Sequence, residues 1–203
     1  MSNNLDSTLT IDFLENLKNQ TATSHKKLES LPVSASILSP QMKMADYCHY
    51  LSLMYDVHYS AQEIIFPLLK DHITDLAERK KTQLINKDLS FLHYTKKNTV
   101  SVFSNKDINV PFALGILYVI EGSSLGGRFI LKNIETIPGL DQQEGVSYFT
   151  GYGNKTGSYW KNFLSQLTTY EQQNNCQDEI IKGAVYAFDT IYNHFLNNSN
   201  NEN

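Results

Sequence analysis

A lysine, a histidine and a glutamate near the N-terminus have the residue types and the spacing of a metal-binding group. Lys18, His25 and Glu29 follow one another at intervals of seven and four residues, so on a helix they share one side with Thr21. A carboxylate one turn after a histidine can accept a hydrogen bond from imidazole Nδ1–H and so orient a metal-bound ring. The arrangement suits haem, with His25 as the axial iron ligand, Glu29 as the orienting carboxylate and the Lys18 ammonium for a propionate.

A second unusual feature is an apolar segment that is interrupted by small residues. Within YVIEGSSLGGRFI, residues 118–130, three glycines and two serines fall in six consecutive positions. Each glycine inside a helix costs about 1 kcal/mol relative to alanine, and glycine–serine groups are a known cause of kinks. Two explanations fit: tight helix–helix packing at a seam of small residues, or a flat ligand lying against the backbone where a Cβ would clash.

The other histidines are expected to be structural or surface residues. Two of them, His49 and His58, are nine residues apart and would lie on opposite faces of one helix, so they cannot bind a common metal. The remaining three have no acidic or cysteine cluster at ligand spacing: His72, His93 and His194.

Composition excludes several classes of protein. The 203 residues suffice for one domain with a hydrophobic core, and 41% of them are hydrophobic. A net charge of −4 argues against a nucleic-acid-binding protein. Two distant cysteines argue against a disulfide framework, and no signal peptide or membrane-spanning run is visible. We therefore expect a soluble, cytoplasmic protein without a membrane partner.

Hydrophobic periodicity predicts an all-α, single-domain fold. We expect a flexible arm over residues 1–9, a helical domain over 10–196 and a disordered tail over 197–203. The helices should include a first one that ends at Pro32, an aromatic-rich one after Pro40, and a glycine-interrupted one over 112–133. Short helical patterns at 73–80 and 82–94 have the polarity of solvated outer layers, and the stretch 145–157 is expected to be irregular. One further helix could be capped by Ser158, with its inner face running to Leu167, and a last helix covers about 178–196.

Three motifs resemble haem oxygenases of the bacterial, biliverdin-producing branch. TATSHKKLE (21–29) is similar to the proximal-helix motif of that family, and EGSSLGG (121–127) is similar to its distal helix. GYGNKTGSYWKNF (151–163) resembles the segment that leads into the later helices. The motifs occur in the family's order and jointly cover the chain from about residue 12 to 195, which makes the resemblance specific.

The resemblance implies a helical bundle in which haem, both cofactor and substrate, lies between a proximal helix with His25 and a kinked distal helix. Such a protein opens haem to biliverdin with dioxygen and external electrons, and it releases carbon monoxide and ferrous iron. Three distal residues would then be catalytic: Gly122, Ser123 and Gly126. Haem contacts would come from Lys18, Thr21, His25, Glu29, Ser124, Gly127, Tyr152 and Lys161, although Tyr152 and Lys161 fit packing or surface positions equally well.

This chain departs from the family pattern at one distal position, and the resemblance also implies redox and product-accepting partners. Animal-type relatives carry an aspartate where this chain has Ser123, so the route by which protons reach the distal side is open. A haem-binding carrier or sensor without turnover is therefore an alternative, and a related fold with a non-haem pocket is a third. No nucleotide-binding motif is present, so electrons would come from a ferredoxin or a reductase. A bacterial phytochrome is a candidate acceptor of biliverdin.

Overall fold

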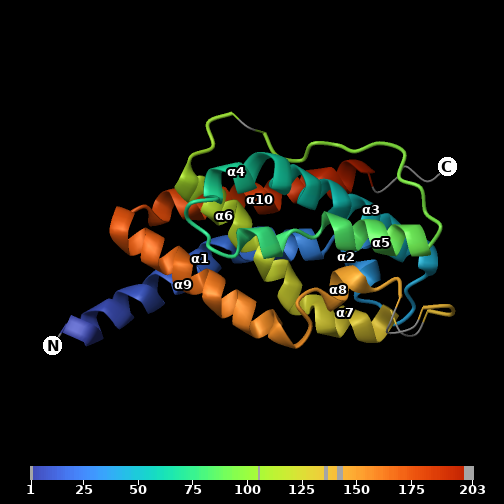
Figure 1. Cartoon of the computed structure of the whole chain (residues 1–203), viewed down its shortest axis with the longest axis horizontal. Coiled ribbons are helices and arrows are strands. Elements are labelled where there is room, and N and C mark those ends of the chain that lie inside the picture. The colour runs from blue at the N-terminus through green and yellow to red at the C-terminus, as the bar shows by residue number, and fades with distance from the viewer. Residues whose placement is uncertain (1, 105, 135–136, 141–143, 199–203) are drawn as a thin grey trace.

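The computed structural model describes residues 2–104, 106–134, 137–140 and 144–198, with side chains described from residue 12 onward except at 128. In these residues, helices are joined by turns and loops, among them a long irregular stretch after α5 (Figure 1). The α-helices are α1 (Ser2–Glu29), α2 (Pro32–Ile37), α3 (Met44–Ser60), α4 (Phe66–Leu69), α5 (Thr82–Phe91), α6 (Val110–Gly122), α7 (Gly127–Ile134), α8 (Ser147–Thr150), α9 (Thr156–Asn174) and α10 (Gln177–Asn198). Shorter turns are the π-helical η1 (Ala61–Ile65) and the 3₁₀ turns η2 (Leu76–Arg79), η3 (Ser123–Gly126) and η4 (Gly153–Lys155). The predicted all-α fold is confirmed.

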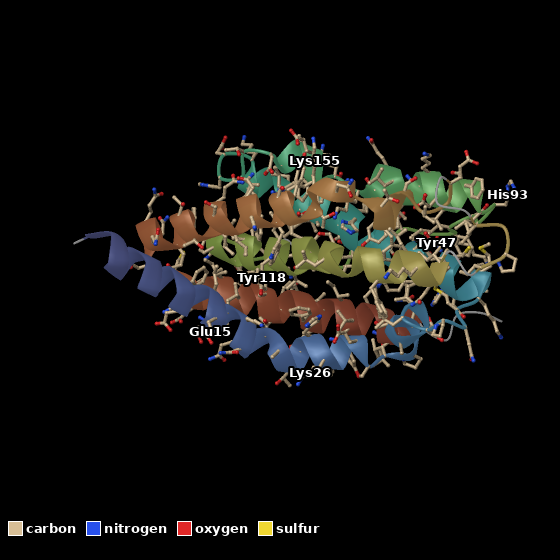
Figure 2. All side chains as sticks on the ribbon, turned by 90° about the horizontal axis from the view of Figure 1, so that it is seen from below. Glu15, Lys26, Tyr47, His93, Tyr118 and Lys155 are labelled. Atoms are coloured by element: carbon tan, nitrogen blue, oxygen red, sulfur yellow. The ribbon has the colours of Figure 1, made fainter. Side chains whose placement is uncertain are left out.

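Helix α10 organises the bundle because it packs along both α6 and α1. Figure 2 shows α1, which carries Lys26, on one side of the molecule and the α6–α7 band, which carries Tyr118, on the other side of α10. At the crossing of α6 and α10, a Cβ on Gly115 would lie 2.0 Å from the Ile180 carbonyl oxygen, and a Cβ on Gly183 would lie 2.0 Å from that of Phe112. The tightest seam of small residues therefore lies at Gly115 and Gly183, outside the glycine–serine segment.

The hydrophobic core runs through the bundle and is continuous from α1 to α10. It is built from the inward faces of the predicted helices, with fully buried Leu17 on α1, Leu51 on α3, Leu114 on α6 and Phe163 on α9. Burial of each such side chain contributes about 1.5–3 kcal/mol. These four helices therefore hold the segments discussed below in fixed positions.

Several boundaries differ from the sequence prediction. Helix α1 begins at Ser2, so residues expected to form a loose arm are helical. Pro32 starts the short helix α2, where its missing N–H is harmless at the first helical position, rather than only ending α1. The stretch 145–157 contains α8 and η4, and Asn197 and Asn198 complete α10, while residues 199–203 lie outside the described residues.

One expectation about burial was wrong. Residues 73–80 and 82–94 were predicted to be solvated outer layers, yet Arg79 in the first segment is 1% exposed and Asp88 in the second is 0% exposed. Lys81, which lies between the two segments, is 3% exposed. The neighbouring Lys80 and Glu78 are exposed as expected. No helix among the described residues is long and apolar enough to cross a membrane.

Candidate haem site and the network behind the distal segment

His25 lies on the outer side of α1, where it is available to a ligand. Its side chain is 55% exposed, and its ring packs on Phe188 of α10 with centroids 5.2 Å apart. The Glu29 carboxylate lies 3.2 Å from His25 Nε2, so the predicted pairing of the two residues is present. The nitrogen differs from the expected Nδ1, and Nε2 must leave Glu29 before it can bind a metal. An exposed side chain can make this rotation at little cost.

The proposed stripe on α1 is not a single face. Lys18 is exposed like His25, but Thr21 is 3% exposed and turns inward. The Thr21 hydroxyl donates to the Leu17 carbonyl oxygen at 2.8 Å and to that of Lys18 at 3.2 Å, which is a common arrangement inside helices. Thr21 thus packs α1 against the bundle, while Lys18 and His25 face outward.

The glycine–serine segment interrupts a helix, as predicted. Helix α6 ends at Gly122, the 3₁₀ turn η3 follows, and α7 continues from Gly127. A 3₁₀ turn inside a helix is tighter than the α-helix and often marks a functional hinge. We call Gly122–Gly127 the distal segment below.

The three glycines of the distal segment have different surroundings. A Cβ on Gly127 would lie 2.7 Å from the Phe149 carbonyl oxygen, so this glycine permits close packing on α8. A Cβ on Gly122 would meet the Trp160 ring at 3.7 Å, an ordinary contact. At Gly126 the nearest atom would be Ile130 Cδ1 at 4.0 Å. Gly126 is therefore the glycine that leaves its backbone uncovered.

Two large apolar side chains flank this uncovered backbone. Leu125 is 49% exposed and Phe129, one turn later, is 60% exposed. Adjacent exposed apolar groups mark a surface that a ligand or partner covers. A flat apolar ring system fits bare backbone at Gly126 between Leu125 and Phe129, and the charged, exposed α1 offers an imidazole and an ammonium for its metal and its acids. By residue type and exposure, an imidazole, an ammonium and apolar side chains beside bare backbone fit haem.

A buried charge network lies under the distal segment. Glu121, the last-turn residue of α6, is 1% exposed and pairs with Arg79 of η2. Arg79 also binds Asp75 through Nη2 at 2.7 Å, and the Tyr152 hydroxyl donates to both Glu121 oxygens at 3.0 and 3.1 Å. Burial works to lower the pKa of Arg79, but the two carboxylates outweigh it and raise this pKa above its usual range. Arg79 is therefore a permanent cation that fixes Glu121.

Helix α8 brings Tyr148 against the same region. Asp88 of α5 accepts the backbone N–H groups of Ser147 at 2.8 Å and Tyr148 at 2.7 Å, which fixes the start of α8. The Tyr148 hydroxyl lies 3.1 Å from His58 Nε2, inside the core. Burial raises the pKa of Tyr148 well above its usual value and lowers that of His58 to about 3. Both groups are therefore neutral near pH 7.

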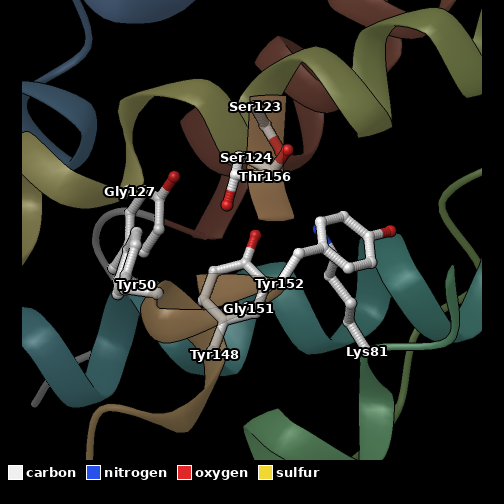
Figure 3. Close-up of a pocket in the computed structure, with 10 residues that line it drawn as sticks. Tyr50, Lys81, Ser123, Ser124, Gly127, Tyr148, Gly151, Tyr152 and Thr156 are labelled. Carbon is white, nitrogen blue, oxygen red and sulfur yellow. The ribbon is translucent and has the colours of Figure 1, made fainter. Parts of the chain in front are cut away.

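A cavity of about 20 Å³ separates the distal segment from α8, which is room for one water molecule. Figure 3 shows the hydroxyls of Ser124 and Tyr148 turned into this space. The Ser123 hydroxyl donates to the Ile120 carbonyl oxygen at 2.7 Å, and that of Ser124 donates to the Glu121 carbonyl oxygen at 2.6 Å. Because their protons are donated to the backbone, the two serine oxygens act as acceptors: that of Ser123 interacts with the Tyr148 hydroxyl, and both can accept from water.

The structure brings together only part of the predicted site. Ser123, Ser124, Gly127 and Tyr152 line one cavity, whereas Lys161 is exposed on α9. Tyr152 stacks on Tyr159 with ring centroids 4.1 Å apart and binds Glu121, so it serves the network behind the distal segment. Sequence reasoning missed Arg79, Lys81, Glu121, Tyr148 and His58 as site residues. One signal was present: Glu121 is a lone carboxylate in an apolar helix, which requires a buried partner.

The structure is thus an all-α bundle with an exposed histidine on one helix and a glycine segment that a 3₁₀ turn interrupts on another. Residues 11–197 match the family described as "Heme oxygenase". The match covers most of the chain, so this protein belongs to the haem oxygenase family.

Individual relatives agree with this assignment. The chain is 26% identical over 184 residues to "Heme oxygenase PigA" of Pseudomonas aeruginosa, covering 86% of this chain and 89% of that protein. Its fold is similar to the NO- and CO-bound haem oxygenase structures from Neisseria meningitidis, with a TM-score of 0.73, 22% identity and coverage of 92% and 91% of the two chains. It is also similar to a haem oxygenase from Leptospira interrogans, with a TM-score of 0.72, 17% identity and coverage of 90% and 98%.

Proposed function

We propose that this protein is a haem oxygenase that converts haem to biliverdin, carbon monoxide and ferrous iron with dioxygen and external electrons. Family membership and the fold of the relatives support this proposal. The observation that carries it is that the chain presents both an exposed, carboxylate-linked His25 on α1 and uncovered backbone at Gly126 on the distal segment.

The chain's own residues would bind and orient the substrate. His25 would ligate the iron after leaving Glu29, and Glu29 would then hold the imidazole in one orientation by accepting its other N–H. Lys18 would contact a propionate, and Leu125 with Phe129 would cover apolar ring surface. When bound, haem supplies the iron centre at which dioxygen is activated.

The distal segment would exclude bulk water and hold protons near the ring. Ser123, in the place of the aspartate of animal-type relatives, is exposed and also lines the cavity, so it connects the ligand side with the interior. Electrons would come from a ferredoxin or reductase, and a biliverdin acceptor such as a bacterial phytochrome would take the product. We place this reaction in the cytoplasm.

Replacement of His25 by alanine tests the assignment. In the presence of hemin and a reductase system, we expect His25→Ala to lose the histidine-type ferric spectrum and haem conversion while it retains some affinity through the apolar surface. The matched control is His93→Asn, because His93 is exposed and has a φ of 53°, which asparagine accepts. Conversion that survives in His25→Ala would overturn the proposal. A wild-type spectrum without conversion would instead favour the carrier or sensor.

A further inference from the structure

Lys81 is a buried lysine beside the water-sized cavity behind the distal segment. It is 3% exposed and lines this cavity with Ser123, Ser124, Tyr148 and Tyr152. Figure 3 shows its side chain rising behind the Tyr152 ring. Its Nζ lies 4.4 Å from the centroid of that ring. Lysine is almost never this buried without a carboxylate partner, so its position needs an explanation.

No carboxylate of a described residue lies within ion-pairing distance of Lys81 Nζ, because the buried carboxylates nearby are taken by Arg79. Arg79 and Lys81 carry two positive charges, and Asp75 and Glu121 carry two negative ones. The cluster is therefore balanced when Lys81 is protonated, so it does not call for a bound anion. Within the cluster, Lys81 is the cation without a direct ionic partner and gives up its proton more easily than Arg79.

The groups that face Lys81 from other elements also indicate that Lys81 gives up a proton easily. Burial is the main cause that lowers its pKa; Arg79 of η2 lowers it further, while Glu121 of α6 opposes the change. Burial raises the pKa of the three cavity tyrosines: Tyr50 on α3, Tyr148 on α8 and Tyr152 before η4. His58 of α3, which the Lys81 charge also affects, is neutral near pH 7. Lys81 is thus the cavity's readiest proton donor.

We propose that Lys81 supplies protons to the distal side of the haem site through a water molecule in this cavity. The Nζ–H gives its proton to the water, and the water passes one of its own to a lone pair of Ser123 or Ser124. The serine's original O–H then turns from its backbone carbonyl acceptor and releases its proton on the ligand side. The neutral amine then regains a proton from solvent. This inference rests on the proposed function, and it explains how a chain with serine in place of the aspartate obtains an internal acid.

The first test uses the haem-free protein and does not depend on turnover. Lys81→Met keeps the length of the side chain and removes its proton, and the matched control is Lys80→Met, because Lys80 is exposed one residue earlier. A folded-state pKa below the unfolded one means that the unfolded chain binds more protons, so the stability of the wild type relative to Lys81→Met should rise with pH up to about 10.5. Urea unfolding from pH 7 to 10 measures this. A difference that stays flat with pH would overturn the proposal.

The second test measures haem conversion with saturating reductant. We expect Lys81→Met to form the wild-type ferric spectrum but to convert haem about a hundredfold more slowly at pH 7 and to lose the decline in rate that the wild type shows as Lys81 deprotonates. Lys81→Arg, which keeps the charge but holds its proton too tightly, should also stay slow, and Lys80→Met should match the wild type. Full activity of Lys81→Met or of Lys81→Arg would overturn proton supply. Absence of conversion by the wild type would instead overturn the proposed function, and the unfolding series would still report the proton affinity of Lys81.

Discussion

Arg79 and Glu121 form an ion pair whose side chains are 0% and 1% exposed, and it joins the turn η2 to the end of α6 directly before the distal segment. The Tyr152 hydroxyl donates to the same carboxylate. Removing one member of a buried pair leaves an uncompensated charge, whereas removing both charges costs much less. This pair therefore holds the start of the distal segment in place, and replacing either of its members alone should destabilise the protein.

The double substitution of the pair should cost less stability than the single substitution of Arg79. We expect Arg79→Met to lower the free energy of unfolding by about 3–5 kcal/mol, because Glu121 stays buried without its cation. Arg79→Met combined with Glu121→Gln should recover part of this loss, since the amide still accepts from Tyr152. Urea unfolding of the single and double variants measures the coupling. Losses that simply add would show that the pair does not act as a unit.

The crossing of α6 and α10 should be intolerant of any side chain. Gly115→Ala would bring a Cβ within 2.0 Å of the Ile180 carbonyl oxygen, and helix backbones cannot yield that much. We expect it to cost about 3 kcal/mol in thermal or urea unfolding. Gly157→Ala is the control, because Gly157 lies in α9 with no atom near its Cβ position, and it should stabilise by about 0.5–1 kcal/mol. Equal effects at the two glycines would contradict the close crossing.

Alanine substitutions at the adjacent glycines Gly126 and Gly127 should affect different properties, ligand binding at Gly126 and packing at Gly127. Gly127→Ala would place a Cβ 2.7 Å from the Phe149 carbonyl oxygen and should destabilise the haem-free protein by about 1–3 kcal/mol. Gly126→Ala should leave that stability unchanged or slightly higher, yet weaken hemin binding by about tenfold, because its methyl group would face the ring. Thermal unfolding and hemin titration of both variants test this. If Gly126→Ala bound hemin as tightly as the wild type, haem would not lie against the backbone at Gly126.

The sequence predicted the helices well because their apolar faces repeat along the chain. The kink at residues 122–127 was also predictable, since glycine and serine act on the backbone locally. The roles of individual glycines were not predictable, because a close approach such as that of Gly127 to Phe149 depends on an element that follows twenty residues later.

Buried charges explain the other failures. Arg79 and Lys81 stand in the polar stretch AERKK, which has no hydrophobic periodicity and so looks solvated. Their burial follows from Glu121 and Tyr152, which lie 42 and 71 residues away from Arg79 and Lys81 respectively. The prediction for Thr21 was wrong in the opposite direction. Its spacing from His25 indicated an exposed position, but the packing of α1 buries its side chain.

His58 should make the protein acid-sensitive. Burial, with a smaller contribution from the Lys81 charge, lowers its pKa to about 3, whereas in the unfolded chain it titrates near 6.5. Between these two pH values the unfolded state binds a proton that the folded state does not bind. The contribution of neutral His58 to the free energy of unfolding is therefore fully present above pH 6.5 and is lost as the pH falls toward 3. His58→Gln can still bond the Tyr148 hydroxyl and does not titrate. Between pH 7 and 5, the wild type should lose about 2 kcal/mol more than His58→Gln in urea unfolding; parallel losses would contradict a neutral buried His58.

The central claim is haem oxygenation, and it is tested most directly by adding a reductase system, oxygen and an iron chelator to the hemin-loaded wild-type protein. The account predicts that the Soret band decays while a broad biliverdin band grows in the red and carbon monoxide is released. A Soret band that persists under these conditions would contradict the account and leave a haem-binding carrier or sensor. The absence of any Soret shift when hemin is added would exclude haem from the site altogether.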